Sequence, residues 1–153
     1  MAITAPLSKY EKNNLKIYIA ALIVVALWCV YDGYFNEKWI KEHTNADGTA
    51  QTYLVFNRKA PYYLGGAAVL FAVYFLAIRD RKVVAENTEL IINDRAKIAY
   101  DSIEKVDKTN FKSKGYFIIT YKDPSGRKVN RKLSDRKYDN LESVLNEIVT
   151  KIS

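Results

Sequence analysis

The chain of 153 residues has the length of one ordinary domain, is 49% apolar and carries a formal net charge of +7. Its one cysteine, Cys29, excludes an internal disulfide, and together with its one histidine, His43, it is too little for a zinc site or a local Cys–His catalytic pair. The mean hydropathy of −0.20 is that of a soluble protein, yet two blocks near the N-terminus hold much of the apolar content.

The first apolar block, "IYIAALIVVALWCVY", contains no charge but is too short to cross about 30 Å of hydrocarbon by itself. If the stem of Lys16 snorkels and Asp32 lies at the interface, the span extends over residues 15–35. We therefore predict a cytoplasmic tail at 1–14 and a first transmembrane helix at 15–35. A cleaved signal peptide is disfavoured because bulky residues follow the block where a peptidase needs small ones.

Residues 36–59 are predicted to form an extracytoplasmic loop. The segment "NEKWIKEH" can continue the helix, "NADG" indicates a turn at Gly48, and "TYLVF" is typical of a short extended piece. We interpret His43 as a solvated surface group. The apolar side chains of the loop rest on the membrane surface or, as we favour, dock a partner protein. These side chains are Trp39, Leu54 and Phe56.

The second apolar block, residues 60–78, spans a membrane without help, with Pro61 suited to its first turn. The absence of a polar stripe on either block disfavours two core helices of a soluble protein. Small residues offer a surface for close helix packing, either on the first span or on another protein's helix. This helix-packing set is Gly65, Gly66, Ala67, Ala68 and Ala72. No ionisable residue lies in the middle of either span, so we expect no transport or proton path through this chain.

Lysine and arginine near the spans predict the orientation. Lys9, Lys12 and Lys16 precede the first span, and Arg79 and Arg81 follow the second. We therefore expect both termini in the cytoplasm and the loop outside.

Residues 82–153 are predicted to form several short antiparallel strands and one terminal helix. "ELIIND" and "AKIAY" have hairpin spacing, and "YFIITYKD" is joined to "RKVNRKL" through the type I turn signal "DPSG". Asp139 and Glu142 resemble a capping box at the start of the helix. The helix has an apolar stripe formed by Leu141, Val144, Leu145, Ile148 and Ile152.

The segment "ELIINDRAKIAYDSIEKVDKTNFKSKGYFIITYKDPSGRKVNRKLSDRKYDNLESVLNEI" resembles the bacterial pleckstrin-homology-like (PH-like) domain in its layout and hydrophobic pattern. Two spans followed by such a domain are similar to small two-span membrane proteins of the bacterial inner membrane. The resemblance implies a membrane α-helical hairpin plus an α+β or all-β domain. That domain would be a PH-like antiparallel barrel of seven strands, capped by a C-terminal helix and used for binding, with no catalytic residues and no cofactor.

The basic residues of the C-terminal domain are interleaved with strand residues, which favours a solvated face that protects a sheet edge. Anionic lipid is the alternative partner. The candidate lipid or partner contacts are Lys112, Lys114, Arg127 and Lys128. The acidic "ENTEL" segment argues against the phosphoinositide loop of eukaryotic relatives, and no motif indicates nucleic acid.

The sequence contains no Ser–His–Asp set, no metal-ligand spacing and no phosphate-binding glycine loop, so we predict no enzyme, no metal and no cofactor. We expect a membrane-anchored accessory or scaffold subunit, or an assembly factor, of a larger membrane complex. In it, the helix hairpin docks on other integral subunits and the PH-like domain binds protein. The alternative is a membrane-surface module whose PH-like domain contacts anionic lipid head groups.

Overall fold

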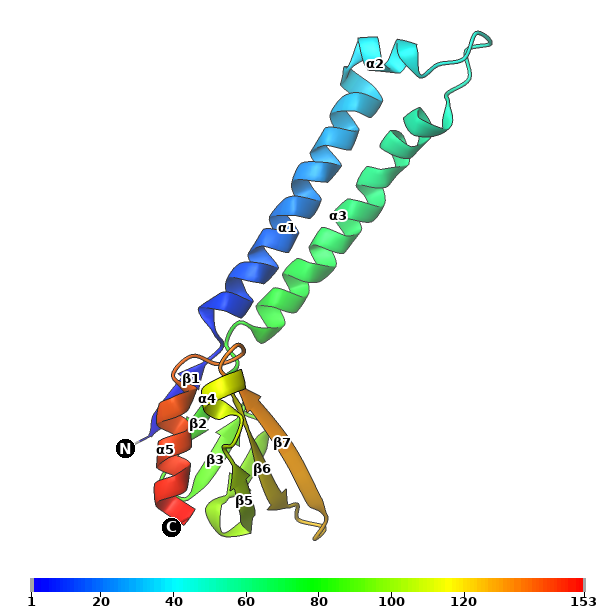
Figure 1. Cartoon of the computed structure of the whole chain (residues 1–153). Coiled ribbons are helices and arrows are strands. Elements are labelled where there is room, and N and C mark those ends of the chain that lie inside the picture. The colour runs from blue at the N-terminus through cyan, green and yellow to red at the C-terminus, as the bar shows by residue number, and fades with distance from the viewer. Residues whose placement is uncertain (1, 153) are drawn as a thin grey trace. The chain divides into compact units, whose positions relative to one another are not determined.

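The computed structural model describes residues 2–152 and divides the chain into two compact units. The sheet unit combines the segment up to Lys12 with everything from Ile78 onward, and the helix unit comprises residues 13–77 (Figure 1). The chain therefore begins in the sheet unit, leaves it for the helix unit, and returns.

The helix unit contains two long antiparallel helices. The first, α1 (Lys9–Val30), begins in the sheet unit and continues through a π-helical turn, η1 (Tyr31–Phe35), into the short α2 (Glu37–Glu42). After a turn at Gly48, which has a φ of 81°, α3 (Thr52–Ile78) returns. Each of the two long apolar stretches has 27 residues, at mean hydropathies of 1.9 and 1.7, and both are long and apolar enough to span a membrane.

The second helix begins earlier than predicted. Residues 52–56 are helical and not extended, so the prediction of an extended piece is wrong. Pro61 lies inside α3 and not in its first turn. Proline cannot donate the helical hydrogen bond to the carbonyl oxygen four residues earlier, which here belongs to Asn57.

The sheet unit contains two antiparallel sheets (Figure 1). The first has the order β1-β2-β3-β4, with bounds Ile3–Pro6, Lys82–Ala85, Glu89–Ile92 and Ala96–Ala99. The second has the order β5-β6-β7, with bounds Ile103–Asp107, Tyr116–Lys122 and Lys128–Ser134. A 3₁₀ turn, η2 (Tyr100–Ser102), links the sheets, α4 (Phe111–Lys114) precedes β6, and α5 (Leu141–Ile152) ends the described chain.

The N-terminal segment differs from the tail that the sequence predicted. Residues Ile3–Pro6 form β1, which pairs antiparallel with β2 in the register Ile3↔Ala85 to Pro6↔Lys82. Ala5 and Leu7 are fully buried. The sheet unit is therefore not built from residues 82–153 alone, and the two long helices are inserted between its first and second strands.

The two sheets and α5 enclose one hydrophobic core. Buried residues alternate along the strands, as Leu90 and Ile92 do on β3 and Phe117 and Ile119 do on β6. The apolar stripe predicted for the terminal helix is confirmed as the buried side of α5 at Leu141, Val144, Leu145 and Ile148. Its fifth predicted member, Ile152, is exposed. Within residues 2–152 no strand pairing joins the two sheets. The expected closed barrel is therefore not observed, and two separate sheets are present instead.

Of two local features that the sequence predicted, a turn is confirmed and a helix cap is not. The turn at Asp123–Gly126 is confirmed, because the Gly126 amide donates to the Asp123 carbonyl oxygen at 2.8 Å. The capping box at Asp139 is not observed, since the Asp139 carboxylate accepts from the Lys9 amide at 3.0 Å instead. The Asp139 carboxylate thus satisfies a free amide at the start of α1 and not one of α5.

Candidate interaction surfaces

The chain leaves the sheet unit for α1 and re-enters it from α3 at the same end. The Leu7 amide donates to the Arg81 carbonyl oxygen at 2.8 Å, and the Asn93 amide donates to the Lys82 carbonyl oxygen at 2.7 Å. Residues from five segments gather at this end, which we call the junction face. The junction face comprises residues 9–12, 79–82, 93–95, 111–115 and 135–139.

Ser8 fixes the start of α1 to the loop between β7 and α5. Its buried hydroxyl accepts from the Glu11 amide at 3.1 Å, which is the N-cap contact of a helix, and donates to the Arg136 carbonyl oxygen. The Ser8 amide donates to the Lys137 carbonyl oxygen at 2.9 Å. Sequence analysis missed this cap, although Ser8 and Glu11 have the Ser-x-x-Glu spacing that indicates one.

The junction face holds most of the excess positive charge of the protein. It contains ten lysines and arginines and five acidic residues, so it accounts for five of the seven net positive charges. Its cationic residues are Lys9, Lys12, Arg79, Arg81, Lys82, Arg95, Lys112, Lys114, Arg136 and Lys137. Among residues 2–152, Arg79 is the one member of this set that forms an ion pair, with its neighbour Asp80 at 3.3 Å.

The hairpin between β6 and β7 is basic too, but the three cations beside its turn have acidic partners. Glu104 binds Lys122 at 3.1 Å and Lys128 at 2.8 Å, and Arg127 lies 3.3 Å from Asp123. Hydrogen bonds from Lys128 and Lys122 lower the pKa of the Glu104 carboxyl. The Ser125 hydroxyl, followed by the Arg127 amide, lowers the pKa of Asp123. These acids are therefore held in their charged form, which offsets the lysines and the arginine.

The structure does not bring the four candidate lipid contacts together. Lys112 and Lys114 lie on α4 at the junction face, because the Asp135 amide donates to the Gly115 carbonyl oxygen at 2.8 Å. Arg127 and Lys128 lie at the opposite end of the second sheet. The seven residues of β6 connect the two ends, which corresponds to about 20 Å of extended strand.

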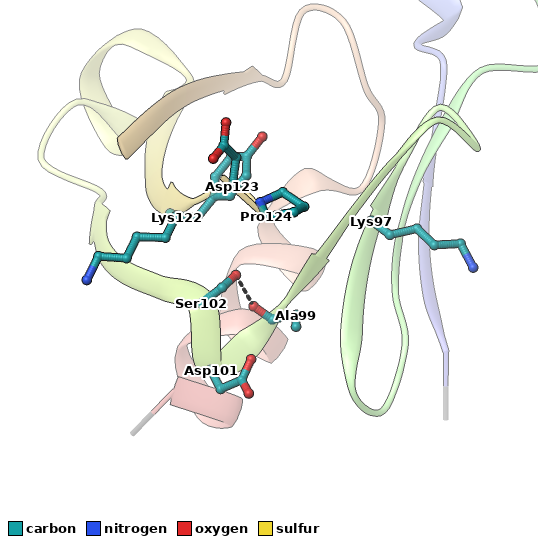
Figure 2. A pocket seen from close by; sticks show the side chains of 8 residues that line it. Lys97, Ala99, Asp101, Ser102, Lys122, Asp123 and Pro124 are labelled. Atoms are coloured by element: carbon teal, nitrogen blue, oxygen red, sulfur yellow. Dashed lines mark hydrogen bonds between the residues drawn. The ribbon is translucent and has the colours of Figure 1, made fainter. Parts of the chain in front are cut away.

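A pocket of about 420 Å³ lies where the first sheet gives way to the second. Figure 2 shows Lys97 and Lys122 directed to opposite sides of it, while the Ser102 hydroxyl donates to the Ala99 carbonyl oxygen at 2.7 Å. Lys97 binds Glu89 at 3.4 Å and Lys122 binds Glu104. The two lysines at the pocket are thus engaged elsewhere and do not converge on one point inside it.

The small residues of α3 divide between two environments. Ala68 is buried and Ala72 is half-buried, whereas Gly66 is exposed. A Cβ atom added to Gly65 or Gly66 would meet no atom within 4 Å. The packing within this chain therefore does not require glycine at either position, and whether they pack on another helix stays a prediction.

The α3 helix and the first helical arm lie close together at Gly33, a glycine that the sequence pattern did not indicate. A Cβ atom on Gly33 would lie 3.2 Å from the backbone carbon and oxygen of Asn57. The Arg58 Nε donates to the Gly33 carbonyl oxygen at 3.0 Å, and the Tyr34 hydroxyl donates to the Arg58 carbonyl oxygen at 3.3 Å. The carbonyl of Asn57, which Pro61 leaves without its usual donor, is thus covered by the neighbouring π-helical turn.

The three residues predicted to dock a partner through the outer loop lie in different surroundings. Leu54 is buried at 1% exposure, so it is not available for docking. Trp39 is half-buried and stacks on His43, with ring centres 3.9 Å apart. Phe56 is exposed on the first turns of α3. No single surface contains all three.

Within residues 2–152, no group of three or more histidine, cysteine or acidic residues is arranged to hold a metal ion. Comparisons with protein-family models, with curated proteins and with solved structures gave no match for this chain.

Proposed function

We propose that this chain is a membrane-anchored, non-catalytic accessory or scaffold subunit of a larger membrane assembly, or a factor that helps to build one. In this proposal α1 and α3 cross the bilayer as a hairpin, and the sheet unit acts as a PH-like binding module. Seven strands in two antiparallel sheets and a terminal helix support the PH-like interpretation. The module would differ from the expected one in that the membrane hairpin is inserted after its first strand.

The exposed surface of the long helices supports the membrane placement. Trp28 on α1 and Leu70 on α3 are 67% and 71% exposed, and many large apolar side chains on both helices share this exposure. A soluble monomer rarely exposes a continuous apolar surface of this kind, whereas acyl chains solvate it without cost. We infer a bacterial inner membrane location with the α1–α3 turn outside.

The observation that carries docking to other subunits is the pair Gly65–Gly66. Glycine inside a helix costs up to about 1 kcal/mol relative to alanine. A Cβ atom added to either glycine would lie more than 4 Å from any packing atom of this chain. Small residues in membrane helices let a second backbone approach closely, so a helix of another subunit is the occupant we propose.

The test is to purify the full-length chain from native membranes in mild detergent and to measure the size and composition of the particle. We expect a complex that contains another integral membrane protein at fixed stoichiometry. The variant Gly66→Leu should run as a monomer. Its matched control, Ala20→Leu, enlarges an exposed residue on α1 and should keep the complex. A wild-type chain that runs as a monomer without a companion contradicts the proposal.

A further inference from the structure

We propose that the junction face is a binding surface for the anionic lipid head groups of the leaflet that α1 and α3 enter. The inference rests on the membrane placement proposed above and goes beyond it, because it assigns a ligand to a surface of the sheet unit. The surface is defined by residues from both ends of the helical hairpin and from three loops of the sheet unit.

Covalent connection keeps the junction face close to the lipid head groups. Two residues join β1 to α1 and three join α3 to β2, which at full extension reach roughly 7 and 11 Å. The Lys16 ammonium lies 5.9 Å from the centre of the Phe75 ring, so these two residues of α1 and α3 lie at the same height along the hairpin. One turn further along, α1 carries Lys12 and α3 is followed by Arg79, where the apolar stretch of α3 has ended.

The loop between β7 and α5 presents its cations outward because its backbone is held from inside. The carbonyl oxygens of Arg136 and Lys137 both accept hydrogen bonds from Ser8, and the buried Tyr138 donates its hydroxyl proton to the Asn93 side chain at 2.9 Å. The Arg136 and Lys137 side chains are exposed. The loop therefore has a fixed position beside the first turn of α1 and two cationic groups directed away from the core.

Most cations of this surface are not engaged in ion pairs within the described chain and are therefore available to bind lipid. Within the described chain, nine of its ten cations form no ion pair, whereas Lys122, Arg127 and Lys128 beside the β6–β7 turn pair with Glu104 and Asp123. Arginine binds phosphate oxygens in a bidentate manner and lysine binds them as a point charge. A face with five net positive charges at the level of the head groups thus fits phosphodiester lipids such as phosphatidylglycerol.

The chain offers an unusually close control for this idea. Arg136–Lys137 and Arg127–Lys128 are both adjacent Arg-Lys pairs, and all four side chains are exposed. The first pair lies at the junction face and the second lies at the opposite end of the sheet unit. Neither pair adjoins a long helix in sequence, so removing either leaves the charges that set the membrane orientation in place.

The experiment uses the full-length chain in detergent micelles, titrated with phosphatidylglycerol or phosphatidylcholine, with bound lipid counted by native mass spectrometry. We expect phosphatidylglycerol to bind more tightly than phosphatidylcholine. The double variant Arg136→Gln with Lys137→Gln should weaken phosphatidylglycerol binding roughly tenfold or more, because each lost charge is expected to lower the affinity about fivefold. Arg127→Gln with Lys128→Gln should change it less than twofold. Raising salt from about 0.1 to 1 M should remove most of the preference.

Two results overturn the inference while leaving the membrane placement intact. One is equal binding of the two lipids by a chain that needs detergent to stay in solution. The other is an equal loss in both double variants, which would reduce the effect to the net charge of the protein. A chain that stays soluble without detergent contradicts the proposed function itself. Circular dichroism of each variant shows that a loss of lipid does not come from unfolding.

Discussion

The amide of Leu7 donates a hydrogen bond to the carbonyl oxygen of Arg81 at 2.8 Å, so a residue shortly before α1 is paired with a residue shortly after α3. This bond continues the ladder between β1 and β2. Both ends of the helical hairpin are thereby held in one sheet. If the hairpin crosses a membrane, it must cross an even number of times, because β1 and β2 lie on the same side.

The first prediction concerns β1 as a part of the core. Ala5→Asp places a carboxylate at a fully buried position without a partner, which costs about 3–5 kcal/mol and should unfold or aggregate the sheet unit. Thr4→Asp, at the exposed neighbouring position of the same strand, should change the free energy of unfolding by about 0.5 kcal/mol or less. Thermal unfolding of the detergent-solubilised chain, followed by circular dichroism, compares the two. Equal stability of both variants would mean that β1 does not belong to the sheet.

The second prediction concerns the cap of α1. Ser8→Ala removes an acceptor for the Glu11 amide and a donor to the Arg136 carbonyl oxygen, so it should lower the free energy of unfolding by about 1–2 kcal/mol. Ser113→Ala, at an exposed serine of α4, serves as the control and should be neutral. The same unfolding measurement checks this. A neutral Ser8→Ala would show that the cap does not hold the junction in solution.

The third prediction compares two glycines. Gly33→Ala brings a Cβ atom within 3.2 Å of the Asn57 backbone, so it should push the two helical arms apart at a cost of about 1–3 kcal/mol. Gly65→Ala meets no atom within 4 Å and should leave the isolated chain as stable or make it more stable by up to about 1 kcal/mol. Unfolding in mixed micelles with increasing dodecyl sulfate distinguishes them. The reverse order would contradict the close contact between Gly33 and the backbone of Asn57.

The fourth prediction concerns pH. Hydrogen bonds from Lys128 and Lys122 hold the pKa of Glu104 below its ordinary value of 4.5. A lowered carboxyl pKa contributes stability above the unfolded-state pKa, and this contribution is lost as the pH falls through the folded-state pKa. Glu104→Gln should therefore lower the melting temperature at pH 7 and have little effect near pH 2. Glu86→Gln, an exposed substitution between β2 and β3, should show no such difference between the two pH values. A Glu104→Gln effect independent of pH would contradict the ion-pair assignment.

Several elements could be predicted because their signal is local. The apolar stripe of α5 has a period that the sequence displays directly, and the Asp123–Gly126 turn needs only four neighbouring residues. β1 could not be found in this way. It has four residues, one of them Pro6, and its partner strand follows 75 residues later, after both long helices. Pairing at that separation leaves no periodic trace in the sequence.

At the start of α3 the sequence does carry a local signal, but the signal predicts the wrong structure. The segment "TYLVF" is composed of residues that favour strands, yet it is helical because it continues a 27-residue helix and buries Leu54. Likewise, the sequence identified the C-terminal domain as basic but did not separate cations with partners from cations without them. Lys128 and Lys137 look alike in the sequence, and only the fold places Glu104 beside the first.

The most direct test of the account is two-sided labelling of single cysteines in a Cys29→Ala chain in sealed, right-side-out membrane vesicles. Ala2→Cys reports on the start of β1, Lys128→Cys on the sheet unit, and Glu42→Cys on the turn between the long helices. We predict that an impermeant maleimide labels Glu42→Cys in intact vesicles and labels Ala2→Cys and Lys128→Cys only after permeabilisation. Labelling of Ala2→Cys and Lys128→Cys from opposite sides would contradict a single sheet unit that holds both ends of a membrane hairpin.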